Sequence, residues 1–203
     1  MNIDYTSYGR KASHFRQARR LVPAVSQAAG ALWEFRWSPT TAGSICLVNR
    51  VALSGLQIAA ATAEELRFNL KIARAFTASD DTNTVSILTA NDMQKLNGDQ
   101  VNSQLAAFRE SNAAAAAAGG TKTLDTDSVA QGSLLSLAVV QTTPFATSLP
   151  IFDYSPLADM EPPLRLEGDE GWVISLEVAK GATAGIVLLL ETAWTEILPN
   201  TLI

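Results

Sequence analysis

The sequence predicts an all-β fold, a two-sheet antiparallel sandwich that we expect to be a jelly roll of about eight strands with few short helices. Apolar and polar residues alternate with period two over residues 31–37 and 66–72, the pattern of half-buried strands. Short runs of Gly, Pro, Asn, Asp, Ser and Thr separate the apolar stretches, as turns do. Of the 203 residues, 47% are hydrophobic and 17% charged, which supplies a core and excludes a disordered chain.

The strand expected at residues 31–37 has an aromatic face. Along this strand two sets of side chains alternate. One face carries Trp33, Phe35 and Trp37, and the other carries Leu32, Glu34 and Arg36. Three aromatics on one face can form a platform for sugars, but in a β-rich chain we expect them in the core. A turn at residues 39–43 and a second strand at residues 44–53 follow.

The clearest strand covers residues 66–76. Its two faces are formed by Leu66, Phe68, Leu70 and Ile72 on one side and by Arg67, Asn69 and Lys71 on the other. One buried and one wet face is typical of an antiparallel sheet. In the polar loop that follows, the pair Asp80 and Asp81 lacks the spaced acids of an EF-hand, so we expect a solvated loop.

Residues 91–118 are the one helical candidate in the body and the only support for an α/β fold as the rival. The polyalanine at residues 113–118 is compatible with a helix end or with a flat, tightly packed strand, and Gly119-Gly120 stops it. The Gly-Gly-Thr-Lys-Thr run after it lacks the glycine spacing of a phosphate-binding loop, which excludes nucleotide binding.

The last third of the chain predicts three more strands. The first covers residues 134–140. Five prolines between residues 144 and 163 then predict a long ordered loop or a crossing between sheets. Strands at residues 172–178 and 186–197 are spaced as a hairpin that closes the fold.

We expect residues 1–30 to form a basic N-terminal arm and residues 31–203 to form the sandwich body. The arm holds five cations against one acid, whereas residues 153–196 hold nine acids against two cations. This asymmetry predicts that the arm of one copy lies on the acidic face of another copy, with a solvated tail as the alternative. The residues expected to make this contact are Arg10, Lys11, Phe15, Arg16, Arg19, Arg20, Leu21 and Val22.

Basic residues interleaved with aromatics are also found in proteins that bind single-stranded nucleic acid. Here the run is short and the formal net charge of the chain is −5, so we do not expect a nucleic-acid partner.

Reactive side chains are scarce. With one His (His14) and one Cys (Cys46), the chain offers no spacing for a catalytic triad or a metal site, and we expect no enzyme, no cofactor and no metal. A pair of acids for glycoside hydrolysis is harder to exclude; Glu34 is the best candidate, yet its phase places it opposite the aromatic face.

Cys46 lies in an apolar run and is expected to be buried. One Cys cannot form an intrachain disulfide, and the N-terminus has no signal-peptide core. No stretch reaches the roughly 18 apolar residues of a membrane span. We therefore expect synthesis in a reducing cytoplasm and no membrane partner.

Several segments together resemble the auxiliary structural proteins of tailed-phage heads, the cement or decoration class. They are residues 33–37 (Trp-Glu-Phe-Arg-Trp), 73–78 (Ala-Arg-Ala-Phe-Thr-Ala), 120–125 (Gly-Thr-Lys-Thr-Leu-Asp), 167–173 (Glu-Gly-Asp-Glu-Gly-Trp-Val) and 193–197 (Ala-Trp-Thr-Glu-Ile). The resemblance implies a β-sandwich or jelly-roll body, homotrimers, the major capsid protein as partner, and a place on the capsid exterior of the virion. One alternative is a receptor- or glycan-binding module on a virion surface that uses Trp33, and a third is an uncharacterised hydrolase.

Overall fold

The computed structural model describes residues 10–59, 63–88, 94–98, 103–137, 148–156, 162–181 and 185–199, and these contain thirteen strands and no helix. The strands are β1 (Arg10–Leu21), β2 (Gly30–Trp37), β3 (Ile45–Gln57), β4 (Glu64–Ala78), β5 (Thr84–Ser86), β6 (Gln94–Gly98), β7 (Leu105–Ser111), β8 (Thr121–Leu124), β9 (Ala130–Ser136), β10 (Leu149–Tyr154), β11 (Leu164–Leu166), β12 (Glu170–Leu176) and β13 (Ile186–Pro199).

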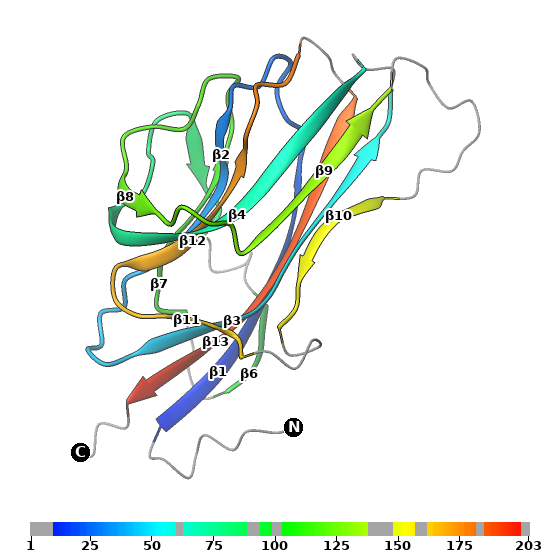
Figure 1. Cartoon of the computed structure of the whole chain (residues 1–203). Coiled ribbons are helices and arrows are strands. Elements are labelled where there is room, and N and C mark those ends of the chain that lie inside the picture. The colour runs from blue at the N-terminus through cyan, green and yellow to red at the C-terminus, as the bar shows by residue number, and fades with distance from the viewer. Residues whose placement is uncertain are drawn as a thin grey trace.

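The strands form two sheets that pack face to face as a sandwich (Figure 1). Sheet A has the order β10-β3-β13-β1-β6, with β11 also on β3. Sheet B has the order β5-β7-β2-β12-β4-β8, with β9 also on β4. The pairings between the named strands are antiparallel. The predicted two-sheet antiparallel sandwich is therefore confirmed.

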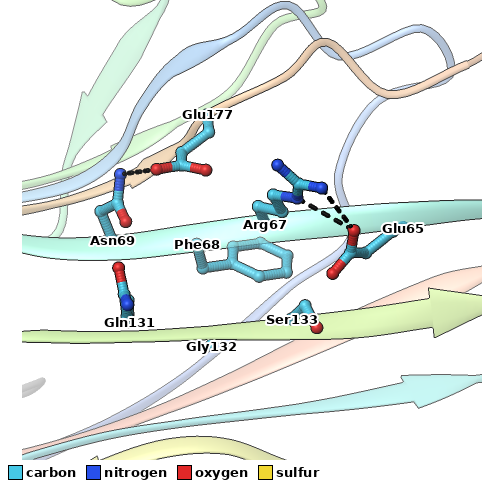
Figure 2. A pocket seen from close by; sticks show the side chains of 8 residues that line it. All are labelled: Glu65, Arg67, Phe68, Asn69, Gln131, Gly132, Ser133 and Glu177. Carbon is cyan, nitrogen blue, oxygen red and sulfur yellow. Dashed lines mark hydrogen bonds and ion pairs between the residues drawn. The ribbon is translucent and has the colours of Figure 1, made fainter.

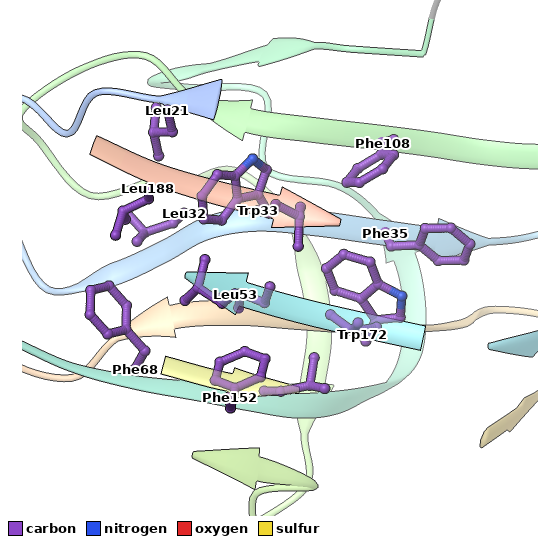
Figure 3. Packing of buried hydrophobic residues seen from close by; sticks show 14 of the residues in the cluster. Leu21, Leu32, Trp33, Phe35, Leu53, Phe68, Phe108, Phe152, Trp172 and Leu188 are labelled. Atoms are coloured by element: carbon purple, nitrogen blue, oxygen red, sulfur yellow. The ribbon is translucent and has the colours of Figure 1, made fainter. Parts of the chain in front are cut away.

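The core between the sheets is aromatic (Figure 3). The Phe35 ring stacks on Trp172, with centroids 5.2 Å apart, and meets Trp194 edge-on at 5.3 Å. The predicted aromatic face of β2 lies in this core, and Trp33 has no exposed surface. The alternation predicted for residues 66–72 is also seen, since Leu66, Phe68 and Leu70 are buried in the same core.

The predicted arm is not separate from the body, because its residues 10–21 form β1 in the middle of sheet A. β1 pairs with β13 over twelve positions, from Arg10 opposite Pro199 to Leu21 opposite Leu188, and β6 flanks its other side. In this strand the exposed cations Arg16 and Arg20 lie among residues that face the core, which gives the sequence the look of an arm. Phe15 and Leu21 belong to the core.

The helix predicted over residues 91–118 is wrong wherever the segment is described. β6 and β7 occupy parts of it, and the polyalanine is an irregular loop whose carbonyls accept hydrogen bonds from other loops. Ala28 N donates to Ala114 O at 2.7 Å and Asn83 Nδ2 donates to Ala116 O at 2.9 Å. Small side chains let this loop lie against the start of β2, where a Cβ on Gly30 would stand 3.3 Å from Ala116 Cβ.

Two predictions for the last third of the chain are also corrected. The proline-rich stretch contains β10 and β11. Pro150 is accommodated because β10 is an edge strand with a bulge after that residue. The missing N–H of this proline therefore removes no hydrogen bond between strands. The final two strands do not form a hairpin, since β12 pairs in sheet B and β13 in sheet A. The strand predicted at residues 134–140 shares only residues 134–136 with β9, which begins at Ala130 and ends at Ser136, and residues 138–140 lie outside the described residues.

Candidate functional sites

The eight residues predicted to bind a partner occupy different environments. Phe15 and Leu21 are buried in the core, which removes them from any contact surface. Arg19 lies between the sheets, with its Nε 3.6 Å from Glu110 Oε2 of β7. The exposed members are Arg16, Arg20 and Val22, and the side chains of Arg10 and Lys11 are outside the description.

Arg16 takes part in a row of alternating charges on the outer face of sheet A. From β1 through β13 and β3 to β10 this row, here called the ionic ladder, consists of Arg16, Glu191, Arg50 and Asp153. Arg16 Nη2 lies 3.9 Å from Glu191 Oε2, Arg50 Nη1 donates to the same oxygen at 2.7 Å, and Arg50 Nη2 donates to Asp153 Oδ2 at 2.9 Å. Neighbouring strands lie about 4.8 Å apart, so the ladder spans about 14 Å.

Alanines fill the positions between these charges. Each charged residue of the ladder has an alanine as a direct cross-strand neighbour, and the three alanines are Ala18, Ala52 and Ala193. The face is a checkerboard of long charged and short apolar side chains. Hydrogen bonds from Arg50 hold the pKa of Asp153 below its ordinary value, so this carboxylate is charged at neutral pH.

Where the structure describes them, the acids of residues 153–196 do not form one acidic face. Glu191 and Asp153 belong to the ladder, whereas Glu196 is fully buried. Glu196 accepts hydrogen bonds from Trp194 Nε1 at 2.9 Å and from the backbone N of Gln104 at 2.8 Å, which fixes the start of β7 on β13. This carboxylate has a structural role.

A second charged cluster lies on the outer side of sheet B and is buried. It consists of Glu34 on β2, Asp80 in the loop after β4 and Lys122 on β8, and we call it the buried triad. Lys122 Nζ lies 2.5 Å from Glu34 Oε1 and 2.9 Å from Asp80 Oδ2. The exposed fractions of the three side chains are 1% for Glu34, 8% for Asp80 and 12% for Lys122.

Sequence reasoning placed Glu34 on the correct face but missed its burial. Asp80 was expected in a solvated loop, and this is wrong: its backbone N donates to Glu34 Oε2 at 2.9 Å, and its Oδ1 accepts from Gly120 N at 2.8 Å. These bonds fold the loop over the sheet. Asp81, the other acid of the pair, is exposed as expected.

The two acids of the triad titrate differently. Burial, and then the hydrogen bond with Asp80, raise the pKa of Glu34. Burial alone would raise the pKa of Asp80 as well, but hydrogen bonds with Glu34, Lys122 and Gly120 outweigh it and lower that pKa. When the pair retains one proton, the proton therefore resides on Glu34.

A polar groove lies along β4 and β9 (Figure 2). Its cavity volume is about 400 Å³, and its polar lining includes Glu65, Arg67, Asn69, Gln131, Ser133 and Glu177. Asn69 Nδ2 donates to Glu177 Oε1 at 2.7 Å, and Arg67 Nε donates to Glu65 Oε2 at 2.9 Å. Phe68, its one aromatic neighbour, is buried and offers no face to a ligand.

The remaining candidates have structural roles. His14 Nδ1 shares a hydrogen bond of 2.7 Å with Thr195 Oγ1 on the neighbouring strand, and burial lowers the pKa of His14. Cys46 is fully buried as predicted, and burial followed by the charge of Glu196 raises the pKa of its thiol well above the ordinary value. Within the described residues, no cluster of His, Cys, Asp and Glu could hold a metal ion, and no helix is long and apolar enough to cross a membrane.

No protein-family model matches the chain, and no curated protein matches it.

Proposed function

We propose that this protein is a structural component of a virus particle, a capsid cement or decoration protein that associates with its own copies on the exterior of a phage head. The observation that carries the proposal is the strand order. Sheet A contains the order β1-β13-β3-β10 and sheet B the order β2-β12-β4-β9. From this order we infer that the sandwich is a jelly roll. Jelly rolls recur in viral capsid proteins. This support is an analogy of fold and bears on the class of function, not on single residues.

The ionic ladder supplies the surface for self-association. Two copies can pack with their ladder faces against each other, related by a two-fold axis that lies between the faces and runs parallel to the strands. This axis reverses the order of the ladder in the second copy. Glu191 of one copy then lies over Ala52 of the other, and Arg50 lies over Ala193. The oppositely charged ends, Arg16 and Asp153, come together. Shape and charge are therefore self-complementary in this arrangement.

The resemblance to cement proteins implies trimers. A two-fold contact through the ladder pairs copies and is compatible with a trimer as the building unit, because two trimers joined by two-fold contacts give a closed hexamer.

Sedimentation of the purified chain tests the self-association. We expect the wild-type chain to associate and the variant Glu191→Arg to be monomeric, because the variant places three cations in a row on both faces. The control is Glu167→Arg, a reversal of an exposed acid that pairs with Arg165 and is not part of the ladder. A monomeric wild-type chain at micromolar concentration, or a Glu191→Arg chain as associated as the control, refutes the contact.

Mass spectrometry of purified particles tests the virion role separately. We expect the chain among the proteins of particles purified from its source. Particles that lack it refute the cement function, whatever its oligomeric state in solution.

The alternatives have less support. A glycan-binding module built on Trp33 is not favoured, because that side chain has no exposed surface, and the polar groove lacks an exposed aromatic platform. For a hydrolase, no specific observation among the described residues is in favour.

A further inference from the structure

The buried triad brings a primary amine and two carboxyl groups together in a site with little exposed surface. Apolar side chains lie next to the triad. The Lys122 Nζ lies 5.3 Å from the centroid of the Phe76 ring. Phe76 in turn packs with Ala73 and Val173 in a small hydrophobic cluster. An ordinary ion pair at this depth loses hydration energy that the attraction between the charges restores only in part. Two carboxylates around one ammonium leave a further negative charge to be neutralised.

The two carboxyl groups of the triad are held in different ways. Glu34 lies in the middle of β2, paired on both sides by β12 and β7, and its Oε1 is the atom nearest to the amine. Asp80 lies in a loop, so its carboxyl carbon can approach the amine with a small adjustment of the backbone.

A hydrogen bond from Gly120 prepares the carboxyl group of Asp80 to act as an electrophile. The Gly120 N–H donates to Asp80 Oδ1 at 2.8 Å, while the amine of Lys122 lies 2.9 Å from the other oxygen, Oδ2. A donor fixed on one oxygen stabilises the negative charge that develops there when a nucleophile adds to the carboxyl carbon. A Cβ on Gly120 would stand 2.4 Å from Asp80 Oδ1, so only glycine allows this approach.

We propose that Lys122 and Asp80 form an intramolecular amide bond, with Glu34 as the catalytic residue that carries protons between them. Neutral Glu34 gives its proton to Asp80 Oδ2 and takes one from the Lys122 ammonium. The free amine adds to Asp80 Cγ, and the charge develops on Oδ1 beside the Gly120 N–H. A second amine proton passes through Glu34 to Oδ2, which leaves as water. The sum is one ammonium and one carboxylate converted to one amide and one water, and Glu34 is regenerated.

Proximity and burial favour the reaction. Holding the amine against the carboxyl group replaces an encounter between two molecules with a step inside one, and exclusion of water opposes hydrolysis of the product. Burial raises the pKa of Glu34, which favours the protonated form that can carry a proton. The product is a neutral amide, which ends the cost of keeping two opposite charges away from water.

The mass of the denatured chain tests the bond. We expect the wild-type chain to be lighter than its sequence by one water. After trypsin digestion, residues 75–95 and 110–165 should appear as one branched peptide, because an acylated Lys122 is not cleaved. Lys122→Arg, Asp80→Ala and Glu34→Gln should each restore the full sequence mass, corrected for the substitution. The matched control Asp81→Asn, at the exposed neighbour of Asp80, should retain the branch.

Three results overturn the proposal. One is a folded wild-type chain with the full sequence mass and no branched peptide, which makes the triad an ion-paired cluster. Another is a branch from Lys122 to residues 21–36, which would place the amide on Glu34. The third is a folded Glu34→Gln chain that is bonded as completely as the wild type, which would remove Glu34 from the reaction. The wild-type mass decides the existence of the bond even if a variant does not fold.

Discussion

Gly132 shows how a single missing side chain joins the two sheets at one side of the sandwich. A Cβ built on Gly132 of β9 would lie 1.9 Å from the backbone oxygen of Ile151 in β10. β9 belongs to sheet B and β10 to sheet A, so the two backbones touch where a side chain would otherwise separate them. No flexible group there can move aside to make room.

We therefore expect Gly132→Ala to destabilise the protein by about 1–3 kcal/mol, the usual range for overpacking a closely fitted site. Urea denaturation followed by tryptophan fluorescence measures this, since all four tryptophans are buried in the core. Gly168→Ala is the control, because a Cβ there meets nothing within 4 Å. Equal stability of the two variants would contradict the close contact.

At the scale of elements, β1 is an interior strand of sheet A. It lies between β13 and β6, and it contributes Phe15, whose ring stacks on Trp194 with centroids 5.6 Å apart. Without β1, the whole hydrogen-bonding edge of β13 would be open and the Trp194 ring would lose a partner.

Removal of residues 1–21 should therefore abolish cooperative unfolding, where a dispensable arm would leave the body intact. Circular dichroism during heating measures this, with Arg20→Ala as the control that removes one exposed cation of the same strand. A truncated chain that melts at the wild-type temperature would show that sheet A forms without β1.

The sequence predicted the strands whose alternation is strong and missed those whose pattern is masked by composition. Residues 31–37 and 66–72 have apolar side chains at every second position, and both lie in strands of the core. In β1 the inward positions include Ser13 and Gln17, which are polar, so the period of two is hidden. The polyalanine has no periodicity at all, and its loop conformation depends on tertiary hydrogen bonds.

The two candidate sites differ in how far a sequence can predict them. Arg16 was identified as a contact residue from local charge alone, but its alternation with Glu191, Arg50 and Asp153 depends on strand order. In the buried triad, Glu34 and Asp80 lie 46 positions apart in the sequence, and Asp80 and Lys122 lie 42 positions apart. No local sequence pattern predicts that these residues come into contact. Gly120, two positions before Lys122, was the one available signal, and it was interpreted only as the stop of the polyalanine run.

For the whole molecule, self-association through the ionic ladder should depend on pH. Hydrogen bonds from Arg50 place the pKa of Asp153 below its ordinary value of 3.8. A lowered pKa means that the charged form of Asp153 is favoured in the folded chain. The stabilisation that this charge gives the ladder is therefore complete above pH 3.8 and is lost as the pH falls through the lowered value.

Sedimentation between pH 7 and pH 3 should therefore show dissociation only at the acidic end. High salt at neutral pH should weaken association in part, because exposed ion pairs are screened. The variant Asp153→Asn lacks this charge at every pH, so it should associate more weakly than the wild type already at pH 7. Association that is unchanged at pH 3 and in high salt would mean that the ladder is not the contact.

The pairing of β1 with β13 decides how the molecule responds to tension. The outer ends of the two strands, at Arg10 and Pro199, lie side by side at one end of the sandwich (Figure 1). A force that separates these two points loads the twelve paired positions one after another, as a zipper opens, and not all together in shear. The strands would part at low force, and a bond between Lys122 and Asp80 in the other sheet would carry none of the load. An attachment that must withstand pulling is therefore best made through one of these two ends alone.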